Sequence, residues 1–148
     1  MTYREEQRDL FTVGEDYYLA HCISADFKLG AGIAVEFDKR FNMRYKLFYE
    51  FPDGFINFMN HYRVEGECIL IDRVLNIVTK KRYYQKPSLS SMKEALAMTK
   101  EVCIGNNISK IAMPKIGCGL DKLHWEDVSA LIKETFMDTN VEILVCYQ

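Results

Sequence analysis

The octapeptide Pro114-Lys115-Ile116-Gly117-Cys118-Gly119-Leu120-Asp121 carries more structural information than any other part of this chain. It follows an apolar run that ends at Met113 and precedes a helical pattern that begins near Trp125. Two glycines around one small residue allow a tight turn and let a ligand approach the backbone closely. A helix N-terminus just beyond favours negative charge nearby. The octapeptide therefore predicts an anion-binding loop that ends in an acid, Asp121.

Composition limits the class of protein. The chain has 148 residues, of which 49% are apolar and 13% aromatic, and this favours one domain, 1–148, with one packed core. The net charge is only -2, so the sequence does not indicate a long nucleic-acid groove, although it is compatible with a local basic patch. No apolar stretch is long enough for a membrane helix, and the charged residues 1–6 do not form a signal peptide core.

The cysteines stand apart in the sequence and form no CxxC pair. This spacing is typical of free thiols in a reducing compartment and argues against a disulfide scaffold or a zinc site. We therefore expect a cytoplasmic protein, or a nucleo-cytoplasmic one in a eukaryote, that is not secreted and uses neither a metal nor a cofactor. The cysteines are Cys22, Cys68, Cys103, Cys118 and Cys146.

Hydrophobic patterning predicts an α/β fold. Helical patterns cover residues 31–41, 88–104 and 125–137, and the second helix could begin at Ser88 or at a capping box that starts at Ser91. Strands that alternate with helices imply a largely buried sheet with helices on its faces. Runs rich in β-branched and aromatic residues predict strands at 10–13, 17–23, 68–71, 74–79, 108–113 and 141–147.

The aromatic-rich segment 43–63 is harder to interpret. Its Pro52-Asp53-Gly54 sequence predicts a turn, and we expect a short helix on each side of it. The favoured interpretation is that its aromatic side chains cover one edge of the core. A flap or a dimer surface is the alternative.

A second glycine motif lies near the N-terminus. Gly30 and Gly32 follow the predicted strand that ends near Ser24, and they could turn backbone amides toward a phosphate. Val35 stands where a dinucleotide-binding fingerprint has its third glycine, and the Gly-Lys-Ser/Thr ending of a P-loop is absent. A glycine turn without a ligand explains this motif equally well.

The cluster Thr79-Lys80-Lys81-Arg82 ends a strongly apolar strand. Because neighbouring strand residues face opposite sides, at most one of Lys80 and Lys81 points at a cleft. Lys81 and Arg82 are interpreted as a solvated turn. A partly buried Lys80 could act as a nucleophile toward a masked aldehyde. Asp121 could then serve as a general acid or base, or it could simply cap the next helix.

Cysteine and histidine side chains are the remaining candidates for chemistry. Cys118 could act as a nucleophile with His21 or His124, but a small buried thiol between glycines is the favoured interpretation. His61 has no partner at metal-ligand spacing, and His124 is expected in the first turn of the last helix.

Taken together, these segments resemble the macrodomain family, and more closely its lysine-dependent terminal ADP-ribose protein glycohydrolase branch. The resemblance spans almost the whole chain. It rests on Arg8–Phe11, on His21-Cys22-Ile23-Ser24, on Gly30-Ala31-Gly32-Ile33-Ala34, on Thr79–Arg82 with Lys86-Pro87, and on Met113–Asp121 followed by Trp125.

The resemblance implies a three-layer α/β/α sandwich with a mixed central sheet and a cleft for ADP-ribose. It places Asp9, Leu10 and Gln148 near adenine, and residues 30–33 and 115–120 near the ribose and diphosphate. The ligand-binding residues that it implies are Asp9, Leu10, His21, Ser24, Gly30, Ala31, Gly32, Ile33, Lys115, Ile116, Gly117, Cys118, Gly119, Leu120 and Gln148.

The resemblance also implies a reaction. Lys80 would attack the anomeric carbon of the distal ribose, displace the carboxylate of a modified glutamate or aspartate and form a lysyl adduct, which Asp121 would help to resolve. The partners would be ADP-ribose and an ADP-ribosylated protein. O-acyl-ADP-ribose deacylation, removal of ADP-ribose from nucleic acid and non-catalytic ADP-ribose binding remain the alternatives, and the oligomeric state stays open.

The chain departs from the pattern of the family or of the branch at three places. Most macrodomains carry Asn-Ala-Ala-Asn where this chain has His21–Ser24, which favours the lysine-dependent subgroup over the asparagine-dependent one. Tyr83, Tyr84 and the segment 43–63 look atypical for the branch, so they bear on substrate preference more than on ADP-ribose binding.

Overall fold

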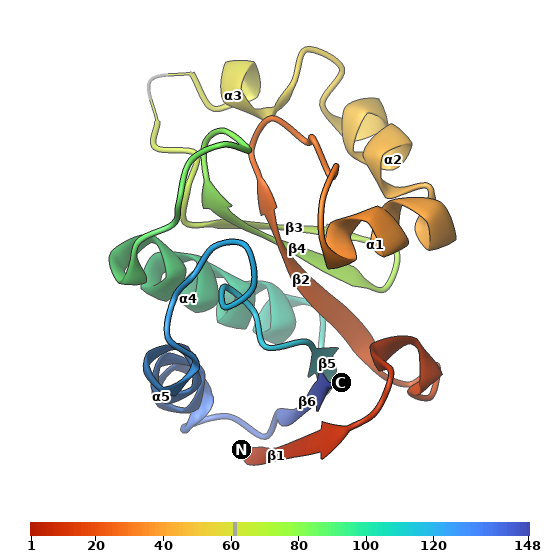
Figure 1. Cartoon of the computed structure of the whole chain (residues 1–148), viewed down its shortest axis with the longest axis vertical. Coiled ribbons are helices and arrows are strands. Elements are labelled where there is room, and N and C mark those ends of the chain that lie inside the picture. The colour runs from red at the N-terminus through yellow and green to blue at the C-terminus, as the bar shows by residue number, and fades with distance from the viewer. Residues whose placement is uncertain (61) are drawn as a thin grey trace.

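A computed structural model describes residues 1–60 and 62–148, which form a six-stranded mixed sheet with helices on both faces (Figure 1). The strand order is β1-β6-β5-β2-β4-β3, and all neighbours are parallel except β3 and β4. The predicted α/β sandwich with a mixed sheet is therefore confirmed. The strands are β1 (Thr2–Gln7), β2 (Tyr18–Ser24), β3 (Glu67–Ile71), β4 (Val74–Lys80), β5 (Lys110–Met113) and β6 (Glu142–Tyr147).

Each face of the sheet has its own apolar core. Phe37, Leu47 and Phe55 bury the helices that follow β2 against one face. Leu96 and Ile132 belong to the core on the other face, where α4 and α5 pack together. The helices are η1 (Leu10–Thr12, a 3-10 turn), α1 (Ile33–Phe41), α2 (Met43–Glu50), α3 (Phe55–Phe58), α4 (Leu89–Gly105) and α5 (Trp125–Phe136).

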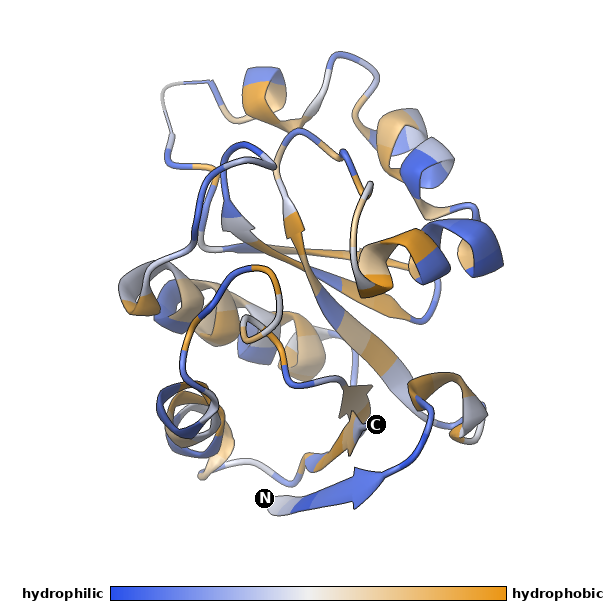
Figure 2. Ribbon diagram, in the orientation of Figure 1, coloured by the Kyte–Doolittle hydropathy of each residue, from blue (hydrophilic) through white to orange (hydrophobic). Residues whose placement is uncertain are grey.

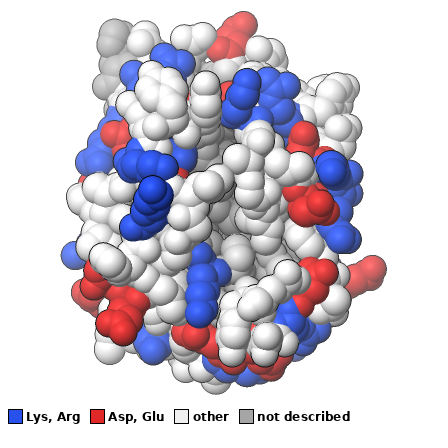
Figure 3. Space-filling model, viewed as in Figure 1, with Lys and Arg blue, Asp and Glu red and all other residues white. Residues whose placement is uncertain are grey.

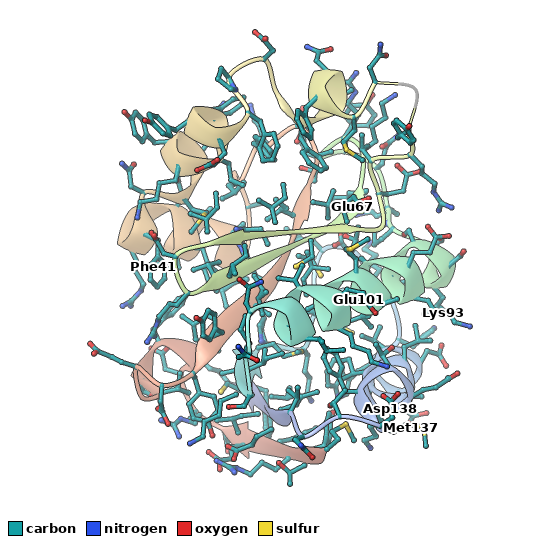
Figure 4. All side chains as sticks on the ribbon, turned by 180° about the vertical axis from the view of Figure 1, so that it is seen from behind. Phe41, Glu67, Lys93, Glu101, Met137 and Asp138 are labelled. Atoms are coloured by element: carbon teal, nitrogen blue, oxygen red, sulfur yellow. The ribbon has the colours of Figure 1, made fainter. Side chains whose placement is uncertain are left out.

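The outer surface of α4 and the end of α5 carry charged side chains. Seen from behind, Lys93 and Glu101 lie on α4, and Asp138 lies just beyond α5 (Figure 4). All three are exposed. Among the described residues, no helix has both the length and the apolar character needed to cross a membrane.

Ser88 starts helix α4. Its hydroxyl accepts a hydrogen bond from the Ser91 amide at 3.0 Å, and the Ser91 hydroxyl accepts one from the Ser88 amide at 3.1 Å. This reciprocal pair satisfies amides that the first turn leaves without partners inside the helix. The expectation of a cap at Ser88 is confirmed, and the alternative start at Ser91 is wrong.

The sequence patterns do not predict the N-terminal strand β1, Thr2–Gln7. Strand β1 is hydrophilic along most of its length (Figure 2), so its sequence carries no apolar alternation. It forms because every residue from Thr2 to Gln7 pairs in parallel with β6. The strand predicted at 10–13 is wrong: Asp9 accepts a hydrogen bond from the Phe11 amide at 2.9 Å and caps a 3-10 turn there.

Segment 43–63 contains the two expected short helices, α2 and α3, with a turn between them. Leu47 and Phe55 are buried, so part of the segment covers the core as expected. Residue 61 lies outside the described residues. Four aromatic side chains of this segment are instead more than 60% exposed, namely Tyr45, Tyr49, Phe58 and Tyr62.

The topology brings the motifs to one edge of the sheet. The chain passes from β2 to β4 on one side and later returns to β5 on the other side of β2. Ligands of open α/β sheets bind at the carboxyl ends of the strands where the order reverses in this way. Ser24 ends β2, Lys80 ends β4 and Met113 ends β5 at this edge.

Candidate functional site

A cleft runs along this edge and has two adjoining parts. The part that contains Lys80, which we call the lysine part, has a volume of about 580 Å³. The part lined by residues 8–11 and the last residues of the chain, which we call the terminal part, has a volume of about 760 Å³. Both are within the usual range for small-molecule sites. The parts share Ile33, Pro114, Lys115 and Gly119 as lining residues.

The face of the molecule that carries the loops is hollowed near its middle (Figure 3). White, uncharged side chains line much of the hollow, and lysine and arginine side chains stand around it together with some aspartate and glutamate side chains. This distribution suits a ligand with an apolar body and a negatively charged section.

Lys80 and Asp121 form the central contact of the lysine part. Lys80 Nζ lies 2.6 Å from Asp121 Oδ1, and each side chain is only 15% exposed. Lys81 lies just beyond the end of β4, is exposed and does not line the cleft, so only one of the two lysines reaches it, as expected. The N-cap of α5 is His124, so the alternative role of Asp121 as a helix cap is wrong.

A register shift helps to aim Lys80. The parallel pairing of β2 with β4 slips between Ile23 and Ser24, so Ser24 lies opposite Lys80. The Ala25 amide then donates to the Lys80 carbonyl at 2.9 Å. This irregularity fixes the end of β4 and with it the direction of the lysine side chain.

The glycine loops require glycine at two positions. Gly32 has φ 62° and starts α1, and no side chain among the described residues caps that helix start. Gly117 has φ 75°, and a Cβ there would lie 2.7 Å from Met92 Cε. Both loops therefore bring bare backbone to the cleft, and the open amides at the start of α1 favour an anion.

The terminal part is built from cations over aromatic rings. The Arg40 guanidinium lies 4.3 Å from the centre of the Phe11 ring, and Lys115 Nζ lies 4.5 Å from the centre of the Tyr147 ring. Such pairs present flat, polarisable surfaces to a ligand. Sequence reasoning missed Phe11, Arg40 and Tyr147 because each stands within an ordinary amphipathic pattern.

His21 lies beneath the cleft and lines neither part of it. It is fully buried, its Nε2 is 2.7 Å from Asn76 Oδ1, and its ring stacks on Phe37 with 3.8 Å between centres. Desolvation lowers its pKa to about 4, although the Asn76 contact opposes this. The direct ligand contact expected of His21 therefore has no geometric support, and the residue instead fills the core below.

The cysteines near the cleft are poor nucleophiles. Burial raises the pKa of Cys22, and the nearby Asp121 charge raises it further. Burial also raises the pKa of Cys118, whose Sγ donates to the Ile116 carbonyl at 3.3 Å. A thiol that stays protonated does not attack, so this geometry favours the expected small packing thiol at Cys118.

Every other candidate residue lines at least one part of the cleft. No cluster among the described side chains could hold a metal ion. Residues that line the cleft and that sequence reasoning did not select include Lys28, Tyr83, Tyr84 and Lys86. The candidates in place are Asp9, Leu10, Ser24, Gly30, Ala31, Gly32, Ile33, Lys80, Lys115, Ile116, Gly117, Cys118, Gly119, Leu120, Asp121 and Gln148.

Comparison with known proteins identifies a relative of similar length. No protein-family model matches the sequence. The chain is 38% identical over 141 residues to human "ADP-ribose glycohydrolase OARD1", and the match covers 93% of this chain and 86% of that protein.

Two solved structures share the fold at low identity. The macrodomain of Thermus aquaticus DarG has a TM-score of 0.82 and 19% identity, and the match covers 99% of this chain and 98% of that one. Thermosipho africanus DarTG in complex with ADP-ribose has a TM-score of 0.75 and 16% identity, covering 99% of this chain and 42% of that one. The chain therefore belongs to the macrodomain family, in the branch of the terminal ADP-ribose protein glycohydrolase.

Proposed function

We propose that this protein is a hydrolase that removes ADP-ribose from ester-linked glutamate or aspartate acceptors through a lysyl intermediate. The observation that carries this proposal is the Lys80–Asp121 pair, 2.6 Å apart and nearly buried at one end of a long cleft. The human relative named an ADP-ribose glycohydrolase supports the same reaction class. The solved DarTG structure, which is in complex with ADP-ribose, supports the ligand.

The cleft suggests how ADP-ribose would lie. The adenosine end would occupy the terminal part, beside Asp9 and Leu10 and the Phe11 ring. The diphosphate would lie over the backbone of the two glycine loops, near the start of α1, where amides favour negative charge. The distal ribose would then reach Lys80 and Asp121 at the far end of the lysine part.

The first step would be attack by Lys80 on the anomeric carbon. Because the ammonium is paired with Asp121, the carboxylate is placed to accept its proton as the amine becomes a nucleophile. The new C–N bond forms as the bond to the acceptor oxygen breaks, and the acceptor leaves as a carboxylate. A carboxylate is a stable anion, so this departure needs no general acid.

The second step would hydrolyse the adduct and regenerate the free enzyme. Asp121 would first release to solvent the proton that it accepted from Lys80, and it would then take a proton from the water that attacks the anomeric carbon of the adduct. The C–N bond breaks, the amine leaves and takes its proton from Asp121, and free ADP-ribose forms. One carboxylate could serve both steps because its Oδ1 lies 2.6 Å from the lysine nitrogen, which is the nucleophile in the first step and the leaving group in the second.

The decisive experiment separates binding from turnover. Calorimetry with free ADP-ribose measures binding, and release of ADP-ribose from an ester-modified peptide measures turnover. We expect Lys80→Ala to keep the affinity for ADP-ribose within about threefold and to lose at least about 10³-fold in turnover, as loss of a nucleophile does. Lys81→Ala is the matched control, since that exposed neighbour does not line the cleft.

Trapping tests the intermediate directly. Cyanoborohydride should reduce the open-chain adduct on Lys80, and peptide mass spectrometry should locate it. Normal turnover by Lys80→Ala would sink the lysine mechanism. Absence of binding at millimolar ADP-ribose would overturn the proposed function as a whole.

A further inference from the structure

Residues 81–86 follow Lys80 directly and contribute to the wall of the lysine part. We call them the strap. Tyr83, Tyr84 and Lys86 of the strap line the cleft. The strap lies between the loop after β2 and the loop after β5, so it borders both loops that surround the ligand.

Asp26 ties the strap to the loop after β2. One carboxylate oxygen accepts hydrogen bonds from the Ser24 hydroxyl at 2.5 Å and the Lys28 amide at 3.2 Å. The other oxygen accepts one from the Tyr83 amide at 2.9 Å. Hydrogen bonds to an ionised carboxylate are stronger than neutral ones, so one side chain joins two loops that are far apart in sequence.

The same region holds the backbone of Lys80. Ser24 lies opposite Lys80 in the sheet, and the Ala25 amide donates to its carbonyl at 2.9 Å. Residues 24–26 therefore bind the chain both at Lys80 and three residues beyond it. Asp26 is the member of this group that holds the segment after the strand, where regular sheet pairing has ended.

Lys86 ties the strap to the loop after β5. Its Nζ donates to the Leu120 carbonyl at 2.5 Å. Leu120 precedes Asp121, whose carboxylate contacts Lys80 Nζ. These contacts close a ring. The backbone connects Lys80 to Lys86, and the Lys86 hydrogen bond reaches Leu120. The next residue, Asp121, forms the ion pair with Lys80.

We propose that Asp26 and Lys86 are positioning residues that hold Lys80 and Asp121 together through the strap. This proposal rests on the proposed function, because it concerns the same reaction. Asp26 does not line the cleft in the part of the chain that the structure describes, so it acts through Tyr83 and the strap. Lys86 lines the cleft, but its ammonium group donates a hydrogen bond to the backbone carbonyl of Leu120, the residue before Asp121.

Asp26→Asn tests the first tie. The amide retains one acceptor oxygen, but its NH₂ group cannot accept, so the variant cannot serve both the Tyr83 amide and the turn at Ser24 and Lys28. We expect a fall of about tenfold in kcat, as one lost positioning hydrogen bond produces, with ADP-ribose affinity within about twofold of wild type. Asp53→Asn is the control, because Asp53 lies in the exposed turn between α2 and α3.

Lys86→Met tests the second tie. It keeps the length of the side chain and removes the donor, so Asp121 should resolve the adduct more slowly. We expect kcat to fall about fivefold, which matches one exposed hydrogen bond, and the trapped lysyl adduct to accumulate. Lys86→Arg should recover most of the rate because it restores a donor. Lys81→Met is the control on the same strap.

A readout independent of activity completes the test. Hydrogen exchange at the Tyr83 amide should be slow in wild type and faster in Asp26→Asn. Variants with the kcat of the wild type would overturn the positioning proposal. Variants in which the melting temperature and the ADP-ribose affinity fall together with kcat would also overturn it, because such a pattern indicates a merely structural role. An inactive wild-type protein would overturn the proposed function, whereas an active wild type with fully active variants would overturn only the positioning roles.

Discussion

The two parts of the cleft are built on different principles. In the lysine part, two charged side chains lie 2.6 Å apart at 15% exposure. In the terminal part, Arg40 and Lys115 lie over aromatic rings at 4.3 and 4.5 Å. A buried pair of opposite charges loses much when one member is removed, whereas an exposed cation over a ring loses little. Chemistry and recognition should therefore respond separately to mutation.

Asp121→Ala should have the largest effect of the following changes. Removal of the carboxylate takes away the proton acceptor for both steps, so we expect kcat to fall by about 10²–10³-fold. The affinity for ADP-ribose should stay within about threefold, since the contacts of the terminal part remain. Steady-state kinetics and calorimetry on the same preparation check this. An equal loss of affinity would show that the two parts are not separable.

The next effect concerns the buried His21 and the pH dependence of the stability of the fold. Burial lowers the pKa of His21 to about 4, whereas an unfolded histidine titrates near 6.5. Between these values the unfolded chain binds more protons, so the free energy of unfolding should fall as the pH drops from about 6.5 toward 4. The loss from this group amounts to a few kcal/mol at most, on the order of 3.

Urea unfolding at several pH values checks this titration. His21→Phe, which keeps a ring against Phe37, should flatten this part of the profile, although Asn76 then loses its partner. An unchanged slope in His21→Phe would assign the pH dependence to other groups. Because His21 lines neither part of the cleft, ADP-ribose affinity per folded molecule should not follow this titration.

Gly119→Leu should act on binding. A Cβ at Gly119 meets no atom within 4 Å, and its φ is not in the left-handed region, so the fold accepts a side chain there. Gly119 lines both parts of the cleft, and a leucine would occupy space where the two meet. We expect the Kd for ADP-ribose to rise about tenfold, which is about 1.4 kcal/mol, with the melting temperature unchanged. Calorimetry and thermal unfolding together distinguish a blocked cleft from a damaged fold.

Arg40→Ala should have the smallest effect. The guanidinium lies over Phe11 and also pairs with Glu36 on the exposed side of α1. An exposed contact of this kind is worth about 0.5–1 kcal/mol, so the Kd should rise about twofold to fivefold while kcat stays the same. A large fall in kcat for Arg40→Ala would contradict the division between the two parts.

The sequence predicted most of the fold because local patterns and tertiary structure agree. The runs that became β2, β4 and β6 are apolar enough to be recognised alone, and Ser88 marks the start of α4. Strand β1 was not predictable from its own residues, because its polar side chains carry no alternation and its pairing with β6 is a property of the sheet. Edge strands often carry charge in this way.

The candidate site was predictable where backbone chemistry dictates the residue type. Glycines at a tight turn and an acid after it leave a clear signature. Strand alternation allows at most one of Lys80 and Lys81 at a cleft, and the family resemblance selects Lys80. The Asp26 contact to the Tyr83 amide was not predictable, since 57 residues separate the partners and aspartate is common in turns. His21 shows the opposite error, because a motif position does not reveal whether a side chain lines the cleft or packs in the core.

The slipped pairing between β2 and β4 has a consequence for how this site could arise or be lost. Two identical amines, Lys80 and Lys81, are neighbours in sequence, but only Lys80, the last residue of β4, lines the cleft. Which of the two amines is available therefore depends on the register of β4 against β2. Deletion of a single residue within β4 would bring Lys81 to the last position of the strand in place of Lys80, without changing either side chain.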